Sequence, residues 1–194
     1  MTDEPTALTA DVCRPVATEE VEHLHEHGWV KLRGFVDPDF VDQMLVHARG
    51  VMGDDADSNP LSPFLEQALS EGAKGLEYFN AQRSGGPENP VIRTLLAGLG
   101  PNAKLLQRRP GPDGALLDVR YYSDFFAPKL PTSHDSKHGG NGPTAYHQDF
   151  ITFAVDRSGG LTFWFPLEAY GPEAGTMSFV DGSRRRRRRW CSRP

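Results

Sequence analysis

Cysteine is scarce in this sequence, and a long apolar run is missing. Cys13 and Cys191 stand near opposite ends without metal-ligand spacing, so we expect two free thiols in a reducing compartment. No apolar run approaches the roughly 18 residues needed to cross a bilayer, and the acidic start of the chain lacks the layout of a secretory signal. These absences predict a cytoplasmic, single-domain protein with no membrane partner.

Common functional motifs are missing as well. The sequence has no glycine-rich nucleotide-binding motif, no serine nucleophile elbow and no paired-cysteine zinc pattern. Of its 21 basic residues, seven are the arginines at 184–189 and 193, which leaves 14 basic against 26 acidic residues in the body of the chain. An acidic body offers no groove for a nucleic acid, so no nucleic-acid partner is expected for it.

Helical signals come first along the chain, and strand signals come later. Apolar spacing and capping residues predict helices at 18–27, from Asp37 to about 52, from about 62 to 69 and from about 90 to 97. Alternating apolar residues predict strands at 29–33, 116–126, 145–155, 161–167 and 176–180. Helices followed by hairpins indicate an α+β fold whose second half is an antiparallel barrel or jelly roll.

The stretch Tyr146-His147-Gln148-Asp149-Phe150 carries the most informative chemistry. Side chains at i and i+2 of a strand share a face, so His147 and Asp149 converge while Gln148 faces away. An imidazole and a carboxylate on one side, completed by a second histidine, form the facial triad of iron(II) oxygenases, which leaves positions open for co-substrate and O2. Taken alone, the tripeptide also suits an ordinary strand with a solvated histidine and aspartate.

The surroundings of this stretch follow a recognisable pattern. After the His-Gln-Asp strand come Leu161–Glu168 with its central Trp164, the turn Glu173-Ala174-Gly175 and the strand end Phe179–Ser183. Upstream, residues 120–124 and the lysine that follows, Lys129, match the strand before the motif. The first helix, the strand GWVKLRGFV and the Asp-Pro-Asp helix start fit too. Over most of residues 18–183 the sequence resembles the phytanoyl-CoA dioxygenase family.

That resemblance implies both a fold and a function. The implied fold is a double-stranded β-helix (jelly roll, cupin-like) with the N-terminal helices packed on it. The implied function is hydroxylation of a small organic substrate with O2, using Fe(II) and 2-oxoglutarate. His147 and Asp149 become the expected catalytic metal ligands, and Lys129 and Trp164 become candidates for binding 2-oxoglutarate. The alternatives for the last two are a solvated lysine and a core aromatic residue.

The sequence departs from the family pattern after Ser183. All seven histidines lie at or before position 147, so the family's distal histidine ligand, and the arginine that binds the far carboxylate of 2-oxoglutarate, have no counterpart. We therefore expect a C-terminally truncated form, inactive alone. It would comprise a flexible N-terminus at 1–17, a partial domain at 18–183 and a disordered Arg-rich tail at 184–194. His134 and His138, in the loop before the motif, are alternative third ligands.

Two other functions remain open from the sequence. The chain is alternatively a non-catalytic remnant or binding module of the same fold. It is alternatively a polyanion binder acting through residues 184–194, although a shifted reading frame also explains that tail. Three more histidines lie on the first predicted helix, where His23 and His27 share a face and His25 does not. For these three, a structural role at the surface is expected.

Overall fold

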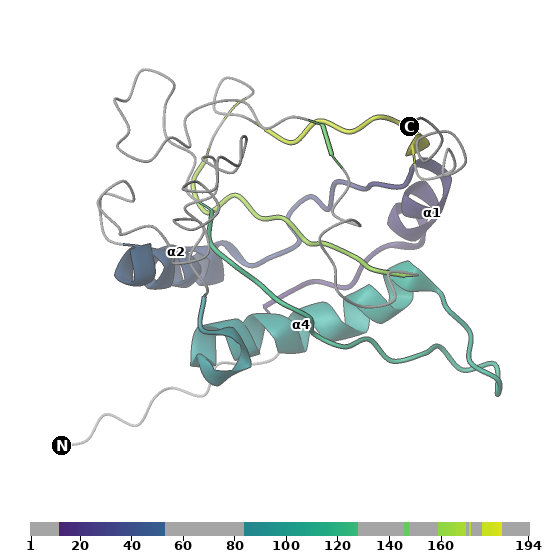
Figure 1. Cartoon of the computed structure of the whole chain (residues 1–194), viewed down its shortest axis with the longest axis horizontal. Coiled ribbons are helices and arrows are strands. Elements are labelled where there is room, and N and C mark those ends of the chain that lie inside the picture. The colour runs from purple at the N-terminus through teal and green to yellow at the C-terminus, as the bar shows by residue number, and fades with distance from the viewer. Residues whose placement is uncertain are drawn as a thin grey trace, which may run out of the picture. The chain divides into compact units, whose positions relative to one another are not determined.

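The computed structural model describes residues 12–52, 84–127, 146–147, 159–169, 171 and 176–183. Its α-helices are α1 (Thr18–His27), α2 (Pro38–Met52) and α4 (Pro90–Gln107) (Figure 1). A short 3-10 helix, η1 (Gly86–Glu88), comes just before α4 in the chain. Among the described residues, β pairing takes the form of isolated bridges, including Cys13 with Val36 and Pro110 with Leu116. No described helix is long and apolar enough to cross a membrane.

The chain divides into two compact units, each built from segments far apart in the sequence. Of the described residues, the first unit contains 12–40, 93–121 and 177–183. The second contains 41–52, 84–92, 122–127, 146–147, 159–169, 171 and 176. Of the residues predicted to form the oxygenase site, His147 and Trp164 are described, and both belong to the second unit.

Helix α1 begins and ends where local signals place it. Its N-cap is Ala17, whose side chain cannot cap a helix, and the Ala17 N–H donates to the Glu20 carboxylate at 2.8 Å. A side chain three residues into the helix thus replaces the missing cap. Gly28 ends the helix at φ 88°, and its N–H donates to the Leu24 carbonyl at 2.8 Å. Because a left-handed residue is favourable only for glycine, this end is fixed by the sequence.

Helix α2 follows the predicted apolar spacing. Asp37 caps it, since its carboxylate accepts the Phe40 N–H at 3.1 Å, and Pro38 has the φ angle that a first helical residue requires. Phe40, Met44 and Ala48 recur at intervals of four and are each at most 2% exposed. One apolar stripe therefore anchors this helix.

Helix α4 is longer than predicted and continues through Gly98, Gly100 and Pro101 to Gln107. The predicted end near residue 97 was wrong, because burial outweighs the local preference of Gly and Pro to end a helix. The buried apolar stripe continues past Ala97, with Leu99, Ala103 and Leu106.

Buried Asn102 reinforces this extension of α4. Its side-chain amide donates to the Gly98 carbonyl at 3.0 Å and accepts the Val16 N–H at 2.8 Å. The side chain is therefore hydrogen-bonded on both of its polar atoms, as burial of an amide requires.

The chain is packed into the first unit from Val12 onward. Val12 and Cys13 are buried, the Asp37 N–H donates to the Val12 carbonyl, and both bonds that flank the Cys13–Val36 bridge are 2.9 Å long. The flexible N-terminus expected at 1–17 therefore does not extend through residues 12–17. The side chains of Val12 and Cys13 pack against the Gly98 turn of α4.

The expected strands do not form paired ladders within the described residues. Residues 29–33, 116–126, 161–167 and 176–180 carry no assigned strand, although single residues within them form bridges. Alternating exposure nevertheless persists at 161–168, where odd-numbered residues are half-buried and even-numbered ones are exposed. The period-2 pattern is thus present without the ladder that would prove a jelly roll. The predicted helix at 62–69, most of the strand at 145–155 and the tail at 184–194 lie outside the described residues.

Candidate functional site

His147 is the described half of the predicted metal pair. It lies in the second unit with an exposed side chain, as does its neighbour Tyr146, which is 76% exposed. Asp149 and Lys129 lie outside the described residues, as do Gln148, His134 and His138. The prediction that His147 and Asp149 share a face therefore stays a prediction.

The donor chemistry of this pair fits Fe(II). An imidazole nitrogen and a carboxylate oxygen are two of the three donors in the facial arrangement used by iron(II) oxygenases. Among the described residues, no group of three or more His, Cys, Asp or Glu side chains is placed to hold a metal ion.

Trp164 lies on the exposed side of its segment. Its side chain is 48% exposed, while Phe163 and Phe165 on either side are half-buried, with ring centroids 6.2 Å apart and nearly parallel at 3°. Both roles considered for Trp164, co-substrate contact and core aromatic residue, stay predictions. An indole that is open on one side remains able to contact a small molecule.

Helix α2 contacts the two segments that flank the His147 motif in the sequence. His47 meets the Phe126 ring edge-on at 5.5 Å, and its Nε2 bonds the carbonyl of buried Ser84 at 2.6 Å. Two residues further on, the Arg49 guanidinium donates to the Glu168 carboxylate at 2.8 Å. Phe126 precedes Lys129 by three residues, and Glu168 follows Trp164 by four. One helix thus holds both candidate co-substrate segments near their ends.

Sequence reasoning did not find these α2 contacts. Arg49 and Glu168 are 119 residues apart, and neither stands in a motif that names the other. The only available hint was the acidic end of the Leu161–Glu168 segment. The acidic end indicates an ion pair only when the structure shows that the Arg49 guanidinium lies beside Glu168.

Asp124, in the segment before Lys129, contains an unusual carboxylate. Its Oδ2 atom is shielded from solvent and has no hydrogen-bond partner among the described residues. A shielded carboxylate oxygen without a donor is unfavourable, so this atom has the character of an acceptor that is satisfied only when another group approaches.

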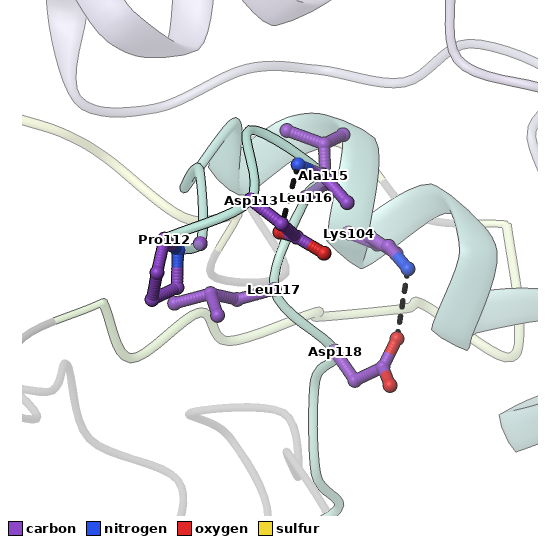
Figure 2. Close-up of a pocket in the computed structure, with 8 residues that line it drawn as sticks. Lys104, Pro112, Asp113, Ala115, Leu116, Leu117 and Asp118 are labelled. Carbon is purple, nitrogen blue, oxygen red and sulfur yellow. Dashed lines mark hydrogen bonds and ion pairs between the residues drawn. The ribbon is translucent and has the colours of Figure 1, made fainter.

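A separate hollow of about 560 Å³ lies in the first unit, between α4 and the turn that follows it (Figure 2). Asp113 accepts the Ala115 N–H at 3.1 Å to shape the turn, and Lys104 pairs with Asp118 at 2.8 Å. This pairing lowers the pKa of Asp118 below its ordinary value. Among the described residues that line the hollow, the one cation, Lys104, is thus already paired, and neither His147 nor Trp164 lines it.

Comparison with known proteins bears directly on the C-terminal part of the chain. Residues 120–191 match the family model described as phytanoyl-CoA dioxygenase (PhyH). Comparison with curated proteins gives no match, and comparison with solved structures gives none either.

The match confirms the resemblance inferred from the sequence. It spans His147 and Asp149, and also Lys129 and Trp164. The class of protein indicated is an oxygenase-type enzyme of a cupin-like fold, acting with O2 on a small molecule. Over residues 120–191, the chain is similar to the phytanoyl-CoA dioxygenase family.

Proposed function

We propose that this protein is a non-haem Fe(II)/2-oxoglutarate-dependent dioxygenase that hydroxylates a small organic substrate. The observation that carries the proposal is the family match over residues 120–191, because it encloses the His147-Gln148-Asp149 tripeptide. The donor types in that tripeptide are those an iron(II) oxygenase requires.

In this proposal, His147 and Asp149 hold the metal from one face of their strand. Lys129 supplies a positive charge for a carboxylate of 2-oxoglutarate, and Trp164 covers one side of the co-substrate. When bound, Fe(II) supplies the activation of O2 and the oxidation of 2-oxoglutarate to succinate. The contribution of the chain is to place the reactants and to limit the access of water. Support for that placement comes from α2, through the His47–Phe126 and Arg49–Glu168 contacts.

His147 and Asp149 are two ligands, so the facial triad needs a third donor that does not come from the His147 strand. The sequence has no histidine after position 147, and its nearest candidates are His134 and His138. We therefore expect weak Fe(II) binding and little 2-oxoglutarate turnover by the 194-residue polypeptide alone. A nitrogen donor supplied from solution should restore part of the missing coordination.

The test measures succinate formed from 2-oxoglutarate with Fe(II) and ascorbate, with and without added imidazole. Imidazole should raise succinate formation in the wild-type chain and have no effect in His147→Ala. Gln148→Ala is the matched control, since its side chain is expected to face away from the metal, and it should behave as wild type. Succinate formation that is the same in wild type and His147→Ala under every condition would contradict the proposal. Such a result would favour a non-catalytic binding module.

A further inference from the structure

We propose that the end of α1 acts as a clamp that fixes the turn Asp181–Ser183, and that the ionised Asp181 carboxylate strengthens this clamp. The clamp consists of His23, His27, Trp29, Phe179 and Asp181. All five residues belong to the first unit, and the described C-terminal end lies beside α1 (Figure 1). The inference concerns this unit alone and does not depend on the proposed oxygenase function.

His27 holds the turn at two points. Its ring Nδ1 bonds the Asp181 Oδ1 at 2.7 Å, and its main-chain carbonyl accepts the Gly182 N–H at 3.0 Å. A further bond from the Ser183 N–H to the Val180 carbonyl at 3.1 Å closes the turn itself. Gly182 has φ 63°, a conformation that other residues adopt with strain, so the turn geometry is built into the sequence. Side-chain and main-chain bonds from one residue fix both position and orientation.

Aromatic stacking extends the clamp beyond the turn. The Trp29 and Phe179 rings are nearly parallel, at 7°, with centroids 5.7 Å apart. His23 lies edge-on to Trp29 at 4.8 Å and stacks on His27 at 4.2 Å. Because His23 and His27 are four residues apart, they occupy one face of α1. Two stacked contacts and one edge-on contact therefore connect the helix face to Phe179, before the turn.

The charges around the clamp favour an ionised Asp181. Hydrogen bonding from His27 is the main cause that lowers the pKa of the Asp181 carboxyl below its usual value. The buried Trp29 N–H, which forms no full hydrogen bond within the described residues, contributes less. Glu26 lies 3.7 Å from the His27 Nε2, so a second carboxylate lies beside the same ring. His23 stacks on that ring.

The clamp joins one part of the chain that the family model covers to one part that it does not cover. Its helix lies upstream of the matched residues 120–191, and its turn lies inside them. His27 and Asp181 are 154 residues apart in the sequence. The clamp therefore makes α1 part of the structure that fixes the end of the Phe179–Ser183 segment.

The test is amide hydrogen exchange of Gly182 in the full chain, read by NMR or by peptides that cover the turn. Removing the carboxylate in Asp181→Ala should speed Gly182 exchange about two- to fivefold, the range for an exposed ion pair. Trp29→Ala should speed Gly182 exchange by about tenfold, because the stacked pair of Trp29 and Phe179 is lost. The Gly28 N–H, bonded inside α1 at 2.8 Å, is the internal reference and should not change.

Asp118→Ala is the matched control, since it removes a carboxylate from an ion pair of similar length in the same unit. It should leave Gly182 exchange as in wild type. If Asp181→Ala unfolds the unit, Gly28 exchange rises too, and His27→Gln then replaces it as the probe. Gly182 exchange that stays at the wild-type rate in Asp181→Ala and Trp29→Ala, with Gly28 protected, overturns the clamp.

Discussion

Arg14 and Glu20 form a two-pronged ion pair, with Nη1–Oε2 at 2.9 Å and Nη2–Oε1 at 2.6 Å. The same guanidinium donates from Nε and Nη2 to the Arg33 carbonyl, at 3.0 and 2.7 Å. It also lies 5.8 Å from the centre of the Phe35 ring. Glu20 in turn accepts the Ala17 N–H at the start of α1. One carboxylate thus ties the helix start to the Cys13–Val36 bridge region.

Replacing Glu20 should therefore destabilise the first unit. Glu20→Ala removes both the ion pair and the helix cap, and we expect a loss of about 1 to 2 kcal/mol in the free energy of unfolding. Urea denaturation followed by circular dichroism measures it. Glu19→Ala is the control, because Glu19 also lies in the first turn of α1. It should cost less than about 0.5 kcal/mol. Equal losses in the two variants would show that Glu20 acts only through the helix dipole.

The same pair gives stability a defined pH dependence. Hydrogen bonding from Arg14 is the main cause that lowers the pKa of the Glu20 carboxyl below its ordinary 4.5. A lowered pKa in the folded state contributes stability that is present above pH 4.5 and is lost as the pH falls through the folded-state value. Unfolding free energies measured from pH 7 down to pH 3 should fall less steeply in Glu20→Gln than in wild type. Parallel curves for the two proteins would contradict this.

Two glycines of α4 should respond in opposite ways to the same substitution. A Cβ at Gly98 would stand 3.0 Å from the Cys13 sulfur and 3.2 Å from a Val12 methyl, whereas one at Gly100 meets nothing within 4 Å. Gly98→Ala should lower the free energy of unfolding, measured by urea denaturation, by about 1 to 3 kcal/mol, because a packed contact is overfilled. Gly100→Ala should be neutral or stabilising by up to about 1 kcal/mol, since alanine favours a helix interior. A stable Gly98→Ala variant would show that Val12 and Cys13 are not held against α4.

Cys13 should be a slow thiol in the folded chain. Burial raises its pKa to about 11, so little of the reactive thiolate exists at neutral pH. Iodoacetamide at pH 8 should modify the Cys13 peptide slowly in native buffer and rapidly in urea, as read by mass spectrometry. Equal rates in the two buffers would place Cys13 at the surface.

Local signals predicted the parts of this fold that depend on neighbouring residues. The ends of α1 and the stripe of α2 follow from side chains within four positions, such as Asp37 and Gly28. The full length of α4 did not follow, because burial of Leu99 and Leu106 depends on distant segments. The contacts of His27 with Asp181 and of Arg49 with Glu168 could not be predicted from local sequence either, because the partners lie far apart in the chain. For the candidate site, a period of two places His147 and Asp149 on one face and the family resemblance singles the pair out; this pairing stays a prediction, and no local pattern identifies the third donor.

The most direct test of the account is an anaerobic Fe(II) titration of the chain followed by calorimetry. His147→Ala and Asp149→Ala should each weaken binding by more than about tenfold, since loss of even a residue that orients a ligand has an effect of that size. Gln148→Ala should bind as wild type does. His134→Ala and His138→Ala, measured beside them, identify any third donor from the preceding loop. Fe(II) affinity that is unchanged in both His147→Ala and Asp149→Ala would contradict the proposed metal site.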